Sequence, residues 1–81
     1  MDAKINIEDK KKYTLLKLEG DFNSNIENEQ LLNTFRDLAK DAKTNVIIDL
    51  TNVVYLNSGS IGTLLSGNAI IRKNNGKLAI F

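Results

Sequence analysis

Cysteine, histidine and proline are all absent from the 81-residue sequence. Without cysteine and histidine, the chain has no disulfide, no cysteine–histidine zinc site and no histidine for acid–base catalysis. A serine nucleophile would lack its usual base, and the carboxylates show no catalytic motif spacing. The composition therefore predicts a protein that is not an enzyme and that holds no metal or cofactor.

An excess of charge and a long apolar run are also missing. The formal net charge is +1, which gives no long-range field for nucleic acid or for an anionic membrane surface. The first residues lack an apolar run of signal-peptide length, and no segment approaches the length of a membrane span. We therefore expect a cytoplasmic protein with no nucleic-acid partner and no membrane insertion.

The size and composition that remain indicate one small globular domain. Apolar residues make up 42% of the chain and charged residues 26%, as in ordinary soluble proteins. A domain of this length buries only about 60% of the surface that its unfolded chain exposes, so its margin of stability is thin.

The N-terminal part of the chain predicts an antiparallel hairpin. Ile5 and Ile7 alternate with polar residues, which is the period of a half-exposed strand. A charged turn at residues 9–12 separates this strand from an apolar one at residues 13–18. The lysines of the turn are interpreted as solvated surface and not as a phosphate site.

An amphipathic helix is expected next. Ser24 and Glu27 have the spacing of a capping box, in which the hydroxyl and the carboxylate each bond a free backbone N–H group at the helix start. The apolar residues that follow share one helical face, namely Leu31, Leu32, Phe35, Leu38, Ala39 and Ala42.

The remaining elements predict a mixed sheet of the α/β class. A β-branched strand at residues 46–50 follows the helix, so it should lie parallel to an earlier strand. A second helix is expected from Ser58 to about Lys73, then an Asn-Asn-Gly stop and a buried strand over residues 77–81. The predicted order is β-β-α-β-α-β, with an N-terminal hairpin and helices packed on one face of the sheet.

Ser58 stands at the expected start of the second helix. Its hydroxyl is placed to cap the free N–H groups of the first turn, and Ile61, Leu64, Leu65 and Ile71 then recur at helical spacing. A helix N-terminus also favours a phosphate group, because the unpaired N–H groups and the macrodipole point at it. The residues alone leave open whether Ser58 is a cap, a phosphate acceptor or both.

The opposite side of this helix is a flat surface of small residues. It comprises Gly59, Gly62, Thr63, Ser66, Gly67 and Ile70. Glycine inside a helix costs about 1 kcal/mol relative to alanine, so this surface needs a reason beyond helix formation. It fits either a docking partner, with Ile70 as an apolar anchor, or close packing against a neighbouring loop or a further C-terminal segment.

The chain resembles the STAS domain (sulphate transporter and anti-sigma factor antagonist), in particular the single-domain bacterial anti-sigma factor antagonists. The similarity is most specific at residues 56–62, Leu-Asn-Ser-Gly-Ser-Ile-Gly, which is similar to that family's Met-Asp-Ser-Ser-Gly-Leu-Gly loop and helix start. It includes residues 18–23, where the family has a Gly-Glu-Leu-Asp-like turn, and residues 48–51 and 75–80. The resemblance implies a single STAS-like domain over residues 1–81 that lacks the family's C-terminal helix.

The resemblance also implies a phosphorylation switch. The family's phosphorylated serine falls on Ser58, and the inverted Gly-Ser order leaves Ser60 as an alternative acceptor. Unphosphorylated members bind an anti-sigma factor serine kinase and free a sigma factor, and phosphorylation by that kinase ends the binding. Asn23 and Asn57 stand where the family has aspartates beside the serine, and we count them among the partner-binding residues.

A second function remains open beside the switch. The chain is then a STAS interaction subunit of a signalling or lipid-transport complex, which contacts its partner through the same face without phosphorylation. Under either function, a sheet covered by only two helices leads us to expect self-association as a homodimer.

Overall fold

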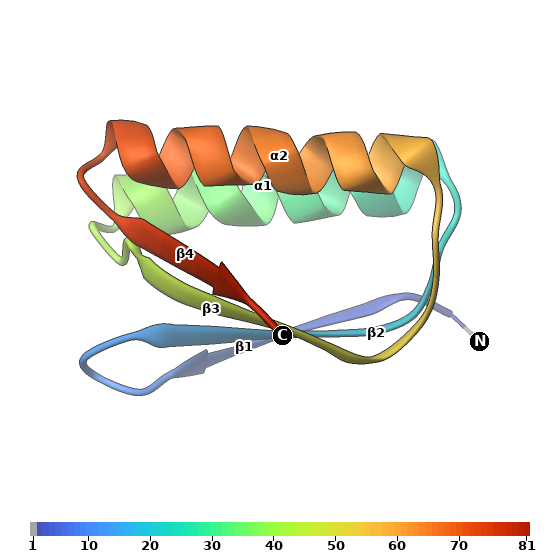
Figure 1. Ribbon diagram of the computed structural model, residues 1–81, viewed down its shortest axis with the longest axis horizontal. Helices are drawn as coiled ribbons and strands as arrows, with labels where there is room; N and C mark the ends of the chain where they lie inside the picture. Colours follow the sequence, from blue (N-terminus) through green and yellow to red (C-terminus); the bar gives the residue numbers. More distant parts are fainter. Residues whose placement is uncertain (1) are drawn as a thin grey trace.

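The computed structural model describes residues 2–81, which form a four-stranded mixed sheet with two helices on one face (Figure 1). The elements are β1 (Lys4–Asp9), β2 (Thr14–Phe22), α1 (Asn25–Lys40), β3 (Asn45–Leu56), α2 (Ser58–Lys73) and β4 (Lys77–Ile80). β1 pairs antiparallel with β2, whereas β2, β3 and β4 are parallel neighbours in the order β1-β2-β3-β4. The predicted α/β class, element order and hairpin are confirmed.

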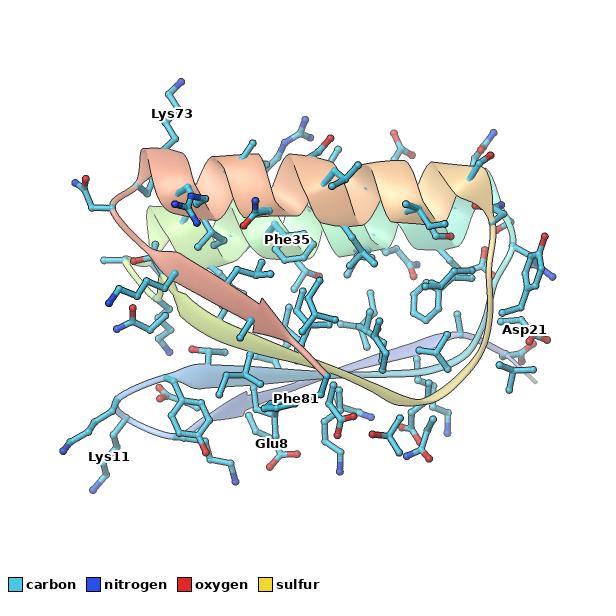
Figure 2. The ribbon with its side chains drawn as sticks, in the orientation of Figure 1. Glu8, Lys11, Asp21, Phe35, Lys73 and Phe81 are labelled. Atoms are coloured by element: carbon cyan, nitrogen blue, oxygen red, sulfur yellow. The ribbon has the colours of Figure 1, made fainter. Side chains whose placement is uncertain are left out.

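The core lies between the sheet and the helices (Figure 2). Strand β2 buries every second residue from Thr14 to Phe22, because alternate side chains of a strand point to opposite faces. From α1, the core receives Leu31, Phe35 and Leu38, which recur at helical spacing. The other fully or nearly fully buried apolar residues are Leu16, Leu18, Val46, Ile48, Leu64 and Ile71.

Helix α1 begins where its capping residues predict. The Ser24 hydroxyl accepts a hydrogen bond from the backbone N–H of Glu27 at 3.5 Å, and Ser24 itself has extended backbone angles. The predicted stop of α2 is also confirmed, since Asn74 is its C-cap and Asn75 has a positive φ of 63°.

Strands β2 and β3 are longer than the sequence predicts. β2 continues to Phe22 instead of Leu18, and β3 continues to Leu56 instead of Leu50. The two extensions pair with each other, with register shifts between Lys17 and Glu19 and between Gly20 and Asp21. Inter-strand hydrogen bonds therefore outweigh the turn propensity of the polar residues in these segments.

The predicted faces of α2 are wrong in part. Leu64 and Ile71 are buried as expected, but Ile61 and Leu65 are exposed, and Ser60 and Gly67 are buried in their place. Apolar residues occur around most of the circumference of α2, so their spacing does not select one face.

Two members of the predicted small-residue surface consequently lie elsewhere. Gly67 faces Phe35 of α1, where a side chain would overlap the ring, and Ile70 is half-buried against the core. Gly67 is therefore not available at an outward docking face, and Ile70 is only partly exposed, so it is not the open anchor that its position in the sequence suggests.

The predicted burial of the last strand is also wrong. Leu78 is half-buried, whereas Ala79, Ile80 and Phe81 are exposed. β4 is an edge strand, so among the described residues only β3 lies beside it in the sheet. Across residues 2–81, neither helix has the length and apolar character needed to span a membrane.

Candidate functional site

The ends of β2 and β3 bring the predicted site residues together. Phe22 and Leu56 are paired across the two strands, and the backbone N–H of Asn57 donates to the Phe22 carbonyl at 3.3 Å. Asn23 and Asn57 follow these paired residues directly. Both therefore lie beyond the C-terminal ends of the two central strands, where α2 begins with Ser58. Asp21 marks this end of the molecule in Figure 2.

The N-cap of α2 is Asn57, so the prediction that Ser58 caps the helix is wrong. The Asn57 side chain accepts a hydrogen bond from the backbone N–H of Ser60 at 2.8 Å, and Asn57 has extended backbone angles. Ser58 is the first helical residue and its side chain is exposed. The Ser58 hydroxyl is therefore not needed to cap the start of the helix.

Ser60 is fully buried in a polar network. Its hydroxyl oxygen lies 2.5 Å from the carbonyl oxygen of Phe22, 2.7 Å from Oδ1 of Asn28 and 2.9 Å from Oδ1 of Asn57. A hydroxyl carries one proton, so Ser60 donates to one of these oxygens at a time. The network joins the end of β2, the first turn of α1 and the N-cap of α2.

Asn28 is a member of this network that the sequence analysis missed. It is buried, and its side-chain nitrogen donates to Oδ1 of Asn57 at 3.2 Å. A signal was present, because Asn28 precedes Leu31 and Phe35 on the buried face of α1, just as Ser60 precedes Leu64 on that of α2. Each helix thus has a polar residue one turn before its buried apolar residues, and this pattern indicates that the side chains of Asn28 and Ser60 meet.

The exposed part of the predicted docking face adjoins Ser58. We keep the name small-residue surface for Gly59, Gly62, Thr63 and Ser66, of which only Thr63 is half-buried. A β-carbon at position 62 would meet no atom within 4 Å, so this part of α2 is open. A groove of about 450 Å³ runs from this surface to α1 and is lined by Asn25, Asn28, Glu29, Leu32, Gly59 and Thr63.

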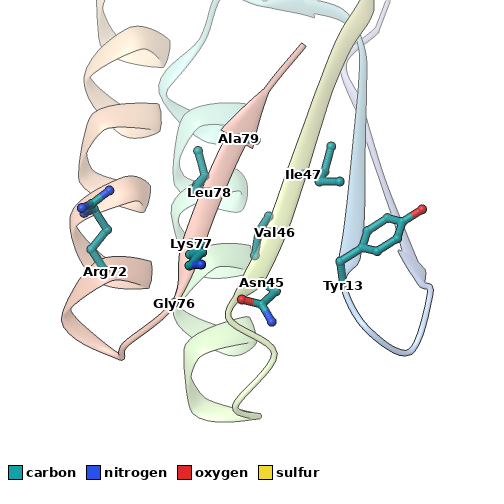
Figure 3. A pocket seen from close by; sticks show the side chains of 9 residues that line it. All are labelled: Tyr13, Asn45, Val46, Ile47, Arg72, Gly76, Lys77, Leu78 and Ala79. Carbon is teal, nitrogen blue, oxygen red and sulfur yellow. The ribbon is translucent and has the colours of Figure 1, made fainter.

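A second hollow lies at the opposite end of α2. Tyr13, Arg72 and Lys77 are among its lining residues, together with the backbone at the start of β4 (Figure 3). Arg72 stands in the last turn of α2, whereas Ser58 opens its first, so this hollow is separate from the candidate site. Within residues 2–81, no group of three histidine, cysteine, aspartate or glutamate side chains is arranged to hold a metal ion.

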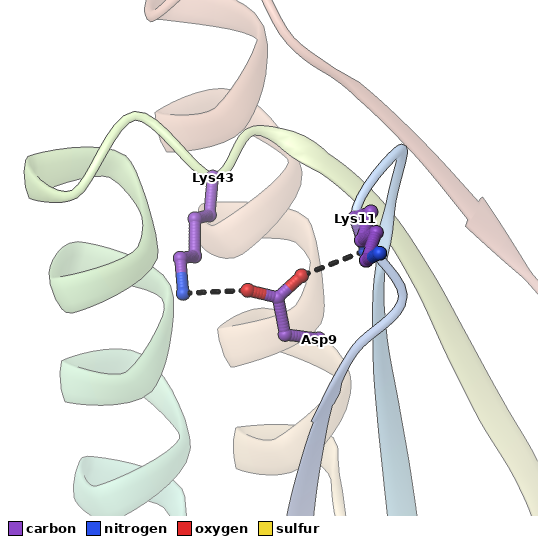
Figure 4. A network of polar contacts seen from close by, with 3 residues as sticks. All are labelled: Asp9, Lys11 and Lys43. Carbon is purple, nitrogen blue, oxygen red and sulfur yellow. Dashed lines mark hydrogen bonds and ion pairs between the residues drawn. The ribbon is translucent and has the colours of Figure 1, made fainter.

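The carboxylates and lysines whose pKa values are shifted lie outside the candidate site; they are Glu8, Asp9, Lys10, Lys43 and Asp49. At the β1–β2 turn, the Asp9 carboxylate accepts from the Lys11 backbone N–H at 2.8 Å and from Lys43 Nζ at 3.0 Å (Figure 4). The Lys11 N–H bond first, then the hydrogen bond from Lys43 and the charge of Lys43, hold the pKa of Asp9 below its ordinary value. This contact joins the β1–β2 turn to the segment after α1.

Solved structures share this arrangement, although no protein-family model and no characterised protein matches the sequence. Unphosphorylated SpoIIAA, an anti-sigma factor antagonist, superimposes with a TM-score of 0.80 over 98% of this chain and 71% of its own, at 14% identity. A STAS domain of an antisigma-factor antagonist from Rhodobacter sphaeroides gives 0.72 over 96% of this chain and 84% of its own, at 15% identity. The chain has the fold of a STAS domain.

A larger protein also contains a part with this arrangement. The structure of Mglu matches with a TM-score of 0.81 over 93% of this chain, at 16% identity, but the present chain spans only 18% of Mglu. The Bacillus cell fate determinant SpoIIAA in its phosphorylated form matches with 0.78 over 93% of this chain and 68% of its own, at 14% identity. At these identities the likeness establishes the fold.

Proposed function

We propose that this STAS protein is a cytoplasmic anti-sigma factor antagonist that docks on an anti-sigma factor serine kinase, and that phosphorylation of Ser58 ends the docking. The observation that carries the proposal is the exposed Ser58 side chain at the first position of α2, beside the small-residue surface. The fold supports it, since SpoIIAA is named as an anti-sigma factor antagonist and is known in unphosphorylated and phosphorylated forms. The chain itself acts by binding and not by catalysis.

The position of Ser58 allows a switch that acts on the complex and not on the fold. A phosphoserine brings about −1.5 to −2 charges and three acceptor oxygens. In the free protein these meet the N-terminus of α2, where a negative charge is favoured. A partner packed closely on Gly59 and Gly62 would have to desolvate the same charge, which opposes binding.

The burial of Ser60 argues against the alternative acceptor. Its hydroxyl lies among Phe22, Asn28 and Asn57, and its side chain is fully inaccessible. A kinase would have to open the N-terminal turn of α2 to reach it. Ser58 needs no such opening.

The test is intact-mass analysis of the protein after incubation with a candidate anti-sigma factor kinase and ATP. We expect one added phosphate on the unmodified sequence and on Ser66→Ala, and none on Ser58→Ala. Ser66 is the matched control, because it is an exposed serine two turns further along the same helix. Binding to the kinase, measured by titration calorimetry, should be lost on phosphorylation and kept in Ser58→Ala.

A phosphate retained in Ser58→Ala would overturn the assignment of the acceptor. Equal affinity of the phosphorylated and unphosphorylated forms would overturn the switch. For either comparison, circular dichroism of each variant shows whether the fold is intact.

A second candidate function is a constitutive docking subunit of a signalling or lipid-transport complex. The observation that favours it is the neutral setting of Ser58, where Asn57 uses its side chain to cap α2 and Asn23 carries no charge. Partner binding through the small-residue surface, without phosphorylation by any cognate kinase, would support this second function.

A further inference from the structure

The groove between the N-terminal turns of α1 and α2 combines polar and apolar groups. The two helices pack side by side (Figure 1). The groove has a volume of about 450 Å³, and all its lining residues belong to these helices, namely Asn25, Asn28, Glu29, Leu32, Gly59 and Thr63. Small binding sites have volumes of about 300–1,000 Å³, so the groove has room for a side chain of a docked partner.

Two polar side chains of the groove are already used within the protein. Both ends of the Asn28 amide belong to the buried network, because Nδ2 donates to Oδ1 of Asn57 at 3.2 Å and Oδ1 lies 2.7 Å from the Ser60 hydroxyl oxygen. The Thr63 hydroxyl donates to the backbone carbonyl of Gly59 at 2.9 Å. These groups serve the packing and the local structure of the helices.

The other polar side chains of the groove are those of Asn25 and Glu29. Both are exposed, and within residues 2–81 neither makes a side-chain hydrogen bond or an ion pair. No lysine or arginine stands three or four positions from Glu29, where helical neighbours meet. Along α1 the first cation is Arg36, and along α2 it is Arg72 in the last turn. Neither helix therefore compensates the negative charge of Glu29.

The helix itself does not account for the charge of Glu29. A negative side chain in the first turn complements the macrodipole, and Glu27 occupies that place on α1. Glu29 is the fifth residue of α1, and the effect of the dipole falls off within the first turn. Its carboxylate is therefore open to a cation from outside the chain.

We infer that the groove receives an arginine side chain of the docking partner, which pairs with the Glu29 carboxylate. The inference rests on the proposed docking function and adds the chemistry of the partner to it. A guanidinium group makes two parallel hydrogen bonds to a carboxylate, and the side-chain oxygen of Asn25 is a further acceptor. The aliphatic stem of arginine covers apolar surface, which half-buried Leu32 provides in this groove.

Arginine suits the groove better than lysine. The planar guanidinium binds a carboxylate and a neighbouring amide oxygen at once, and it is less strongly hydrated than an ammonium group. The groove presents this pair of acceptors, Glu29 and Asn25, on one helix four positions apart, where side chains are neighbours. We therefore expect a lysine probe to bind more weakly than an arginine probe.

The groove lies on a different side of α2 from Ser58. At 100° per residue, Ser58 is about 120° around the helix from the midpoint of Gly59 and Thr63. A phosphate on Ser58 therefore does not share the groove with the arginine, and it opposes docking from another part of the same interface. The arginine contact and the phosphorylation switch can be tested separately.

The first test uses the chain alone, with acetyl-Gly-Arg-Gly-amide as the probe and ¹H–¹⁵N NMR as the readout. We expect saturable shifts of the backbone amides of Glu29, Leu32 and Gly59. The dissociation constant should be on the order of millimolar, because one exposed ion pair contributes little. The same peptide with citrulline, which has a similar shape but no charge, should not shift these amides, and the lysine peptide should bind more weakly.

Glu29→Gln should weaken binding of the arginine peptide at least threefold. The matched control is Asp37→Asn, because Asp37 is also an exposed carboxylate on α1 but lies outside the groove. Equal shifts with the arginine and citrulline peptides would overturn the inference, since the charge would then not be recognised. Equal weakening by the two variants, or an absence of shifts in the groove at tens of millimolar peptide, would overturn it as well.

The second test measures docking of the unphosphorylated chain on the candidate anti-sigma factor kinase. Glu29→Gln should weaken the affinity at least fivefold and make it less dependent on salt, because an ion pair across the interface is lost, whereas Asp37→Asn should change neither. Unchanged affinity for Glu29→Gln would overturn the arginine contact even if Ser58 is phosphorylated. If no kinase binds, the proposed function fails, and the peptide titration still decides whether the groove recognises arginine.

Discussion

Gly67 of α2 lies against the ring of Phe35 of α1, so closely that a β-carbon at position 67 would overlap the ring. Phe35 is fully buried at this point, and it packs between the helices and the sheet (Figure 2). The contact explains a helical glycine by close approach of α1 to α2 within the molecule. Gly62 of the same helix has a different environment, because it faces open space.

Gly67→Ala should destabilise the protein by about 1–3 kcal/mol, the cost of overpacking a filled core. The better helix propensity of alanine, about 1 kcal/mol, offsets only part of this cost. Urea unfolding followed by circular dichroism measures the change. An increase in stability would show that Phe35 can move aside, contrary to its packing here.

Gly62→Ala is expected to act in the opposite direction. A β-carbon at position 62 meets no atom within 4 Å, so alanine should stabilise α2 by up to about 1 kcal/mol. The same unfolding experiment provides the measurement, with Gly67→Ala as the matched substitution in one helix. If a partner approaches the backbone of α2 as proposed, Gly62→Ala should also weaken partner binding, and unchanged affinity would place the partner elsewhere.

Asn57→Ala should cost about 0.5–2 kcal/mol, because it removes the N-cap of α2. Its side chain also lies 2.9 Å from the buried Ser60 hydroxyl, which loses a polar neighbour. Ser58→Ala removes neither contact and should change stability by less than about 0.5 kcal/mol. Thermal unfolding of the two variants shows which residue caps α2. A larger loss of stability for Ser58→Ala than for Asn57→Ala would contradict the assignment of Asn57 as the N-cap.

Asp9→Asn should make the stability less dependent on pH. The pKa of Asp9 is lowered in the folded protein, by the Lys11 N–H bond first and by Lys43 second, so folding favours the ionised carboxylate. Its contribution is present above the unfolded pKa, near pH 4, and is lost as the pH falls through the lowered folded pKa. Urea unfolding between about pH 2 and pH 7 should show the two proteins converging at the acid end.

The size of this pH effect should be small, because Asp9 and Lys43 are exposed to solvent. A parallel measurement in high salt should reduce the Lys43 part and leave the backbone hydrogen bond. If the stability difference between Asp9→Asn and the unmodified chain stayed constant across the pH range, the carboxylate would not be responsible.

Strand alternation, capping residues and turn residues determined most of the fold. Ile5 and Ile7 predict β1, Ser24 predicts the start of α1, and the Asn-Asn-Gly segment predicts the end of α2. Each of these signals depends on residues within a few positions of one another, so it can be read without the tertiary structure. The resemblance predicted that Asn23, Asn57 and Ser58 belong to one site, and the fold places all three at the C-terminal ends of β2 and β3.

Only the tertiary structure decided which hydroxyl is buried and which side of α2 is exposed. Ser58 and Ser60 are two positions apart and chemically identical, but contacts with β2 and α1 enclose Ser60 alone. Ile61 and Leu65 are exposed and Gly67 is buried because α2 packs on α1 as well as on the sheet. Contacts between residues distant in the chain set these outcomes, and local spacing by itself does not determine them.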